Sequence, residues 1–522
     1  MTGAKINTGT TGRETGSTGG DAGITGREAG ATDRDAGTTS GDARKAGREA
    51  ETSGLQAGST DLNSGSTGWQ SGKTGLNANT TVWKEYEKIL FRLAFIYFFL
   101  QVFPLDWKYY RHLFSIDWLH LSFAEIFQIA KYTPQFISGS YHPQDWGLAT
   151  FGDWAFILLL SVIGTVIWSL LDKKNTQYER LYAYLRILVR YRLAIAVIAY
   201  GFLKLFAIQA PYPSISALNT PYGNFTSWKI FSLSLGIVPG YQAFLGAVEL
   251  VAGLFLLYRK TAVIGATIII FFTGNVFMSN LAYVGGEVVY SFYLVTLALF
   301  LIVYDGQRLI KLIILHVPVA PAQPALIWKN NLGVLRLVLK SALVLVFVLI
   351  YGFSARRAAV GGGYHFTKEK GVKDIKGLYT VSSFKINGDI LPYSLTDTVR
   401  WQDVVFEKWA TLSIRINKNY PLTEDNVERV PGAGQKSAYE SSGTIGRSYY
   451  NFKANPATHT LQLQGASADT RAGQLEYALQ PDSTVLLKGI VEGNRVEAVL
   501  DKNNKKYLLK AAQKGRNRSL KL

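Results

Sequence analysis

Residues 262–304 read AVIGATIIIFFTGNVFMSNLAYVGGEVVYSFYLVTLALFLIVY. This stretch holds two apolar runs, Ala262–Tyr283 and Val288–Tyr304, and it contains no lysine or arginine. Each run approaches the roughly 20 apolar residues that an α-helix needs to cross the hydrocarbon core of a membrane. The stretch therefore predicts two consecutive membrane helices joined by a short turn.

Five further apolar runs lie on either side of this pair. They are Ile89–Phe103, Phe151–Leu171, Arg192–Ile208, Tyr241–Tyr258 and Val334–Phe353. Flanking aromatic residues lengthen the shorter runs at the membrane interface. Residues 83–354 are therefore predicted to form an all-α polytopic membrane domain with about seven spans. The first run also fits a re-entrant or interfacial segment.

The composition supports this prediction. Hydrophobic residues make up 48% of the 522 residues and charged residues only 18%, against about 25% in soluble proteins. A wholly soluble protein is thereby excluded. Cysteine is absent, which excludes disulfides, iron–sulfur clusters and thiol redox chemistry in this chain. In so apolar a chain, the net charge of +18 indicates cytoplasmic membrane loops, and no nucleic-acid partner is expected.

Lysine and arginine are distributed unevenly among the predicted loops. They gather after the second span, after the sixth span and at Arg259-Lys260, whereas the loops 105–150, 209–240 and 284–287 hold few or none. The positive-inside rule then places the N-terminus in the cytoplasm and the segment after the seventh span outside. Within loop 105–150, the apolar pattern from Trp118 to Ile129 predicts an amphipathic helix lying on the outer leaflet.

The two ends of the chain are polar. Residues 1–82 are rich in Gly, Thr and Ser, and short Gly/Thr/Ser/Ala motifs recur there every seven residues. Such a segment cannot bury enough apolar surface to offset its ordering entropy, so a disordered tail is predicted. Residues 511–522 form a basic tail.

Residues 370–510 are predicted to form a small all-β domain. Short runs alternate between apolar and polar residues and are separated by turn residues, which is typical of strands. The runs are 378–386, 399–406, 411–416, 449–453, 460–464, 474–479, 484–490, 495–500 and 506–509. Nine short strands in succession predict a meander that closes into a barrel. The start at Gly377-Leu378-Tyr379 resembles the Gly-x-Trp start of lipocalin-like barrels, with Tyr in place of Trp.

Two charged residues stand inside apolar runs. Lys204 lies late in the third run and Glu249 lies in the middle of the fourth. A charge in hydrocarbon is costly and usually faces the interior of the protein, so these two residues form a candidate intramembrane ion pair. The pair would serve packing or assembly, or it would serve as a ligand or proton site. Alternatively, Lys204 reaches the outer interface by itself.

Other polar residues lie close to the predicted outer side of the spans. They form a candidate polar pocket made of Arg192, Tyr200, Asn275, Asn280 and Tyr290. These groups would either line a ligand site or hydrogen-bond between helices. The six histidines include no pair at metal-binding spacing, so no metal site is expected. The sequence contains no nucleotide-binding or hydrolase motif, and catalytic residues stay unknown.

Residues 192–308 resemble the DoxX-like family of membrane proteins. The resemblance lies in these motifs: Tyr200-Gly201-Phe202-Leu203-Lys204-Leu205-Phe206, Gln209-Ala210-Pro211-Tyr212-Pro213, Thr220-Pro221-Tyr222-Gly223, Gly236-Ile237-Val238-Pro239-Gly240-Tyr241, the segment around Glu249, Tyr258-Arg259-Lys260-Thr261 and Asn275-Val276-Phe277-Met278. A lipocalin-like domain after the last span is similar to longer members of the family from Bacteroidota.

The resemblance implies a four-helix membrane core with flanking spans. It also implies a place in the bacterial inner membrane, with the C-terminal domain in the periplasm. Some members belong to quinone-linked redox or oxidative-stress complexes, so membrane redox subunits are candidate partners and a quinone, not covalently bound, is the candidate cofactor. The alternative is a non-enzymatic membrane scaffold whose outer β domain binds a lipid or an envelope protein. Whether the chain is an enzyme stays open.

Overall fold

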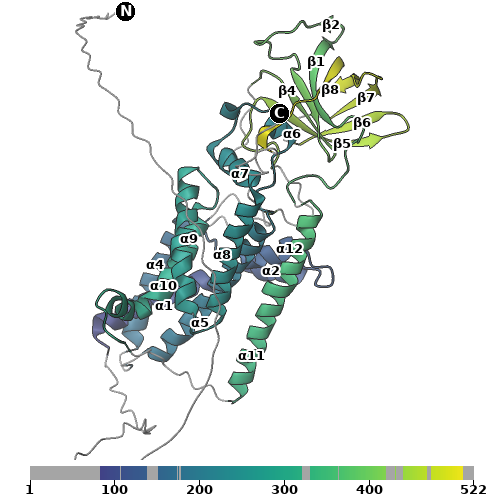
Figure 1. Cartoon of the computed structure of the whole chain (residues 1–522). Helices are drawn as coiled ribbons and strands as arrows, with labels where there is room; N and C mark the ends of the chain where they lie inside the picture. The colour runs from purple at the N-terminus through teal and green to yellow at the C-terminus, as the bar shows by residue number, and fades with distance from the viewer. Residues whose placement is uncertain are drawn as a thin grey trace, which may run out of the picture. The chain divides into compact units, whose positions relative to one another are not determined.

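The computed structural model contains a helical region followed by a β-barrel (Figure 1). It describes residues 83–105, 107–137, 151–172, 175, 178–319, 330–362, 364–418, 430, 439–466 and 472–509. The predicted disordered tail, residues 1–82, and the predicted basic tail, residues 511–522, lie outside the described residues.

The helical region runs from residue 85 to residue 360. Its elements are α1 (Glu85–Val102), α2 (Trp107–Ser115), α3 (Phe123–Ala130), α4 (Phe151–Leu171), α5 (Glu179–Leu205), α6 (Ile215–Leu218), the 3₁₀ turn η1 (Tyr222–Asn224), α7 (Ser227–Ile237), α8 (Pro239–Leu257), α9 (Ala262–Ala282), α10 (Val288–Ile313), α11 (Asn330–Val344), the π-helical segment η2 (Leu345–Ile350) and α12 (Tyr351–Val360).

Within the described residues, five helices are long and apolar enough to cross a membrane. They are α4, α8, α9, α10 and the continuous helix 333–360 that joins α11, η2 and α12. The predicted first and third spans are also helical, as α1 and α5, but both carry several charged side chains. The prediction of about seven spans is therefore not confirmed, and the four-helix core stays a prediction.

Helix α5 forms the centre of the helical region. Its buried residues pack against α8, α10 and α1. Glycines allow α8 to approach closely, since a Cβ on Gly246 would lie 2.1 Å from the backbone nitrogen of Leu205. A Cβ on Gly253 would likewise lie 2.6 Å from the side chain of Ile198. Small residues at such contacts are typical of helix pairs in membranes.

The predicted amphipathic helix 118–129 is shorter and more deeply buried than expected. Helix α3 begins only after Ser122. The Ser122 hydroxyl accepts a hydrogen bond from the backbone of Glu125, and the Glu125 carboxylate accepts one from the backbone of Ser122, which together form a capping box. Ile126 and Phe127 are 0% and 2% exposed because α3 packs against α5 and α12. The prediction of a helix lying on a membrane surface was therefore wrong, because an apolar face can be covered by protein as well as by lipid.

The β domain is a closed barrel. Its strands are β1 (Gly377–Ile386), β2 (Asp389–Ile390), β3 (Asp403–Phe406), β4 (Thr411–Arg415), β5 (Arg447–Asn455), β6 (Thr460–Gly465), β7 (Gly473–Leu479), β8 (Val485–Val491) and β9 (Asn494–Asn503). All strand pairs are antiparallel. Because β1 pairs with β9 as well as with β3, eight strands form a closed ring. The short strand β2 pairs only with β1 and lies outside this ring. The predicted strand 506–509 is wrong, since the ring is already complete at β9.

The barrel encloses its own apolar core. Tyr379, Phe384 and Phe406 are essentially inaccessible to solvent inside it. Arg400 is 1% exposed and donates hydrogen bonds to the backbone carbonyls of Val381, Leu391 and Trp401. Strands β3 and β4 are buried on both faces, which means that other parts of the chain cover their outer surface.

Candidate functional site

Lys204 and Glu249 lie side by side in the helical region. The Lys204 Nζ is 2.5 Å from Oε1 of Glu249, and the two side chains are only 7% and 6% exposed. Lys204 comes from the last turn of α5, and Glu249 from the middle of α8. The two residues that stood out in the sequence thus form an ion pair between neighbouring helices.

The pair forms because glycines bring the two helices together. Gly201 lies one turn before Lys204, and Gly246 lies one turn before Glu249. A Cβ at Gly246 would lie 2.6 Å from the carbonyl oxygen of Gly201, so side chains larger than hydrogen would push α5 and α8 apart. The pairing therefore depends on the same close approach that packs the helices.

The second carboxylate oxygen of Glu249 takes no part in the ion pair. Its Oε2 is buried and has no hydrogen-bond partner among the described residues. The Lys204 Nζ lies 5.6 Å from the centre of the Phe272 ring on α9. A buried acceptor without a donor is costly, so this oxygen is the place in the pair where a donor from outside the chain could bind.

A second ion pair joins the end of α3 to the start of α10. Lys131, just after α3, pairs with Oε1 of Glu287, which precedes α10. The Tyr200 hydroxyl donates to the other oxygen of Glu287 at 3.2 Å. Both oxygens of this carboxylate are therefore engaged, in contrast to those of Glu249.

Arg192 lies in the middle of α5 and holds the chain that follows α3. Its guanidinium donates to the backbone carbonyls of Ala130, at 2.5 Å, and of Tyr132. Residues 131–135 are all buried although they form no helix or strand. Irregular backbone inside a membrane domain needs such protein partners for its polar groups.

The candidate polar pocket is only partly assembled. The rings of Tyr200 and Tyr290 lie 5.5 Å apart, and Asn280 accepts a hydrogen bond from the backbone of Glu287 at 3.3 Å. These residues and Arg192 thus surround the Lys131–Glu287 pair. Asn275 lies on the exposed surface of α9 and does not join them.

A network of buried charged and polar groups joins the barrel to the segment between α5 and α8. Arg447 on β5 is fully buried and donates to Asp403 at 2.6 Å, to Ser413 at 3.0 Å and to Thr220 at 3.3 Å. Arg415 binds the second oxygen of Asp403 at 2.6 Å. Because Thr220 follows α6, this network, which we call the junction network, fixes the outer wall of the barrel to the helical region.

Further contacts extend this junction. Glu407 accepts hydrogen bonds of 2.7 Å from both the backbone nitrogen and the hydroxyl of Ser216. The backbone of Thr226 donates to Gly443, and that of Ile445 donates to Asn224. Together with the Arg447 contacts, they explain why β3 and β4 are buried on both faces.

Three titratable groups at the junction have strongly shifted pKa values. Burial lowers the pKa of Lys229 to about 7, although its ammonium donates to the carbonyl of Tyr439. Burial and the neighbouring Glu407 raise the pKa of Glu440 to about 8. Burial lowers the pKa of His365 to about 3, so it is neutral and binds the Ile208 carbonyl at 2.7 Å. At neutral pH, His365 is therefore uncharged, Glu440 is mostly protonated and Lys229 is about half protonated, because burial disfavours the charged form of each group.

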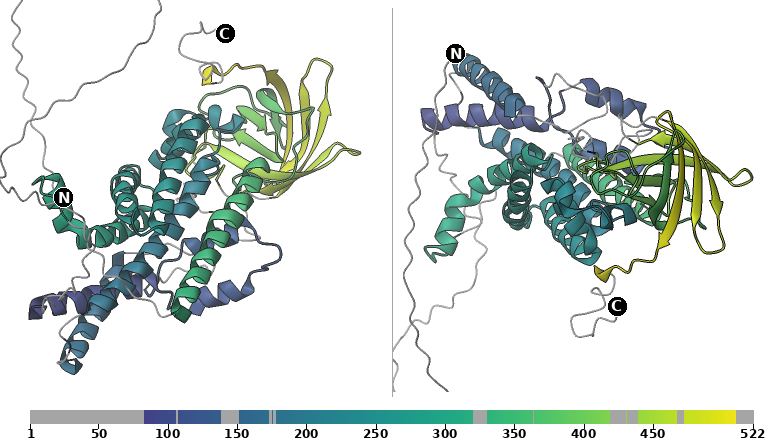
Figure 2. Two further views of the ribbon diagram at one scale, coloured as in Figure 1. Left: turned by 60° about the horizontal axis from the view of Figure 1, so that its bottom comes forward. Right: turned by 90° about the horizontal axis from the view of Figure 1, so that it is seen from above.

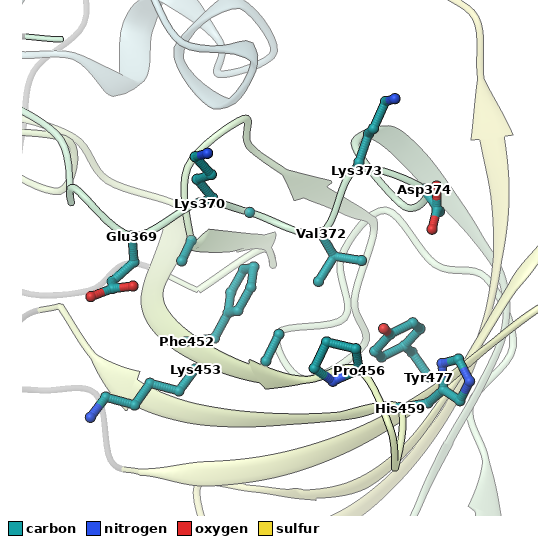
Figure 3. A pocket seen from close by; sticks show the side chains of 13 residues that line it. Glu369, Lys370, Val372, Lys373, Asp374, Phe452, Lys453, Pro456, His459 and Tyr477 are labelled. Carbon is teal, nitrogen blue, oxygen red and sulfur yellow. The ribbon is translucent and has the colours of Figure 1, made fainter. Parts of the chain in front are cut away.

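The barrel carries a cleft of about 620 Å³ at the end where residues 369–374 cross it. In Figure 3, Val372, Phe452 and Tyr477 gather at the centre of the cleft, whereas the amino groups of its lysines point outward. The lining residues are Glu369, Lys370, Gly371, Val372, Lys373, Asp374, Ala410, Phe452, Lys453, Ala454, Pro456, His459 and Tyr477. The cleft combines an apolar floor with a rim rich in cations.

Comparison with known proteins leaves the chain without an assigned family. No family model, no curated protein and no solved structure matches it. Within the described residues, no group of three or more His, Asp or Glu side chains is placed to hold a metal ion.

Sequence reasoning missed the Lys131–Glu287 pair and the junction network. Glu287 is the only charged residue in the stretch 262–304, which is a signal that could have been used. Lys131 gave no such signal in the sequence, because lysines are common in loops. Arg447 and Asp403 lie at strand ends, where charged residues are common.

Proposed function

We propose that this chain is a multi-pass protein of the bacterial inner membrane and is related to the DoxX-like family. The five long apolar helices support a membrane location, and the loop charges favour a cytoplasmic N-terminus and a periplasmic barrel. A reporter fused after Gly362 is expected to be active outside the cytoplasm, and one fused after Lys260 inside. The opposite pattern would contradict this orientation.

We further propose that the protein is a subunit of a quinone-linked redox complex. The observation that carries this proposal is the buried Oε2 of Glu249, which has no hydrogen-bond donor among the described residues. A quinol hydroxyl is a donor that a bilayer supplies, and Phe272 beside Lys204 offers a ring for it to contact. These two groups are what supports a quinol head group as the ligand.

A bound quinol would supply two electrons and two protons on oxidation. Glu249 would accept a hydrogen bond, and then a proton, at Oε2. Lys204 would stay at Oε1 and would hold the carboxylate in position. Because the chain has no cysteine and no histidine pair at ligand spacing, the electrons would pass to a partner subunit.

Purification of the full chain from membranes with its co-extracted quinone tests this proposal. The Lys204→Met/Glu249→Gln double variant is expected to lose bound quinone and quinol-coupled turnover by about tenfold or more, because one hydrogen bond to a charged group contributes about 1.5–3 kcal/mol. The matched control is Lys131→Met/Glu287→Gln, which removes a buried pair with no free oxygen. Equal losses in both variants, or no quinone in the wild type, would contradict the proposal.

The second candidate function is that of a scaffold whose barrel binds a lipid or an envelope protein. The barrel cleft favours it, because its apolar floor and its lysines suit an amphiphile with an anionic head. A Phe452→Asp variant is expected to abolish co-purification of such a ligand, while Tyr393→Asp, on an exposed loop of the same barrel, should leave it unchanged. Co-purification that neither substitution affects would place the ligand elsewhere.

A further inference from the structure

Helix α2 turns an aromatic face away from the protein. Trp107 and Phe114 are 66% and 77% exposed, and Arg111, which is also exposed, lies between them in the sequence. The spacing of four and then three residues puts these three side chains on one face of the helix. In both views of Figure 2, α2 is the short dark purple helix at the edge of the helical region.

Exposed apolar side chains continue on both sides of α2. Phe103 and Leu105 before the helix, and Trp118 and Leu119 after it, are between 37% and 90% exposed. A local concentration of large exposed apolar side chains marks a surface that binds a partner or a membrane. We call the following residues the α2 surface: Phe103, Leu105, Trp107, Phe114, Trp118 and Leu119.

The opposite face of α2 attaches the helix to the protein. The rings of Tyr109 and Tyr132 lie 4.8 Å apart, and Ile116, just after the helix, is buried. Tyr132 belongs to the buried segment whose carbonyls accept hydrogen bonds from Arg192. The inner face of α2 is therefore fixed, and the α2 surface is held in its outward position.

Hydrogen bonds show the level of the helical region at which α2 lies. At the end of α1, just before α2, the Gln101 carbonyl accepts a hydrogen bond of 3.0 Å from Tyr293 in the second turn of α10. Beyond α2 and α3, the backbone nitrogens of Phe136 and Ile137 donate to Asp153 at 2.7 and 2.8 Å. Asp153 lies in the first turn of α4. The chain that carries α2 is thus attached to the beginnings of two helices that are long and apolar enough to cross a membrane.

We propose that the α2 surface lies in the lipid headgroup region of the outer leaflet, which makes α2 an interfacial helix. The proposal rests on the membrane location and orientation proposed above but not on the quinone site. Tryptophan is enriched at this depth of a bilayer. Interfacial helices bury a face of Trp, Phe and Leu about 5–10 Å into the boundary between headgroups and acyl chains. The interfacial helix is therefore α2, and not the buried α3 that follows it.

The position and charge of this face favour lipid over a protein partner. The first turns of α4 and α10 mark the level at which the membrane begins, so lipid lies beside the α2 surface as soon as the chain is inserted. Arg111 stands in the middle of the aromatic face. In a dry protein interface this cation would be costly without an acidic partner, whereas at headgroup level it reaches phosphate and water through its long side chain.

Spin labelling of the full chain in nanodiscs of phosphatidylethanolamine and phosphatidylglycerol tests the proposal. The chain contains no cysteine, so each introduced cysteine carries the only label. Phe114 is exposed, so Phe114→Cys should leave the packing of the protein unchanged. Its label is expected about 5–10 Å below the phosphate level, where it collides more often with oxygen than with a water-soluble nickel chelate.

Two exposed positions provide matched controls for this measurement. A label at Leu159→Cys, in α4, should report the acyl-chain region, and one at Tyr393→Cys, on the barrel, should report water. A Phe114 label as accessible to the nickel chelate as the Tyr393 label would overturn the proposal. A Phe114 label that neither reagent reaches, or that shows spin–spin broadening from a second copy, would also overturn it, because protein would then cover the α2 surface. A Leu159 label in water would instead overturn the membrane location.

Discussion

The Lys204–Glu249 pair and the junction network around Arg447 are both buried sets of charges, but they are satisfied differently. Asp403 in the network has both carboxylate oxygens in ion pairs at 2.6 Å, one with Arg447, which also donates a hydrogen bond, and one with Arg415. Glu249 has one oxygen bound by Lys204 and one that has no partner in the part of the chain that the structure describes. A carboxylate with every acceptor engaged specifies a unique packing, whereas one with a spare buried acceptor can take a ligand.

The two sets also differ in what they connect. The pair joins two adjacent helices whose backbones are already in contact through glycine. The junction network joins a barrel wall to a loop of the helical region, with Arg447 reaching the Asn219 carbonyl at 3.4 Å. Loss of the network should therefore loosen one part of the protein from another, while loss of the pair acts within the helical region.

The largest effect is expected from Arg447→Met. This substitution removes the buried guanidinium that donates to Asp403, Ser413 and Thr220. The free energy of unfolding of the barrel should therefore fall by about 5 kcal/mol. Thermal unfolding of the full chain in detergent measures this loss. Arg495→Met on the exposed side of β9 is the control and should change stability by less than about 0.5 kcal/mol. Similar losses of stability in Arg447→Met and Arg495→Met would mean that the junction network does not stabilise the barrel more than a surface residue does.

A smaller effect is expected from Glu249→Gln, which leaves the Lys204 ammonium uncompensated. The free energy of unfolding should fall by about 3 kcal/mol, because removal of one partner of a buried pair leaves the other charge buried without compensation. The double variant Lys204→Met/Glu249→Gln should recover much of it. A thermal-shift series on both single variants and the double variant measures the coupling. Strictly additive losses would show that the residues are uncoupled.

Gly246→Ala tests whether the close approach of α5 and α8 holds the pair together. The added Cβ would lie 2.1 Å from the Leu205 backbone, and overpacking of this kind costs about 2 kcal/mol. Gly274→Ala in α9, where nothing lies within 4 Å of the added Cβ, should leave the melting temperature unchanged or slightly higher. If Gly246→Ala is equally harmless, the helices tolerate separation and the pair does not depend on it.

The smallest effect concerns pH at the junction. The pKa of Lys229 is lowered by burial to about 7 from its usual 10.5, so between these values the unfolded chain binds a proton that the folded chain lacks. Stability should therefore rise with pH in this window, by at most about 1.4 kcal/mol per pH unit. Melting curves between pH 8.5 and 9.5 should show a steeper rise in the wild type than in Lys229→Met. Equal slopes would mean that Lys229 is not buried in solution.

Much of the secondary structure could be predicted because it depends on neighbouring residues. The predicted span 151–171 coincides with α4, and the predicted strands from 378 to 500 correspond to those of the barrel. Two predictions of secondary structure were wrong, those for the segments 118–129 and 506–509, and each has a physical reason. The apolar face of α3 looked the same whether lipid or protein covered it, and the alternating pattern at 506–509 could not reveal that the ring was already closed.

The candidate site was predictable only where a charge interrupted an apolar run. Lys204 and Glu249 were visible for that reason, and the structure places them 2.5 Å apart. Lys131 and Arg447 lie in a loop and at a strand end, where a charge carries no information about its partner. Asn275 met the same polar criterion as Asn280 but points to the exposed surface of α9, since polarity alone does not determine which face of a helix packs.

The sequence by itself determined that apolar helices precede short strands, because length and periodicity of hydrophobic residues are local properties. Only the tertiary structure decided which charges meet and which carboxylate keeps a free oxygen. Such contacts join residues far apart in the chain, such as Thr220 and Arg447, and the contact between Lys204 and Glu249 also depends on how closely two backbones approach. Glycines such as Gly246 set that distance, and their role becomes visible only when the facing helix is in place.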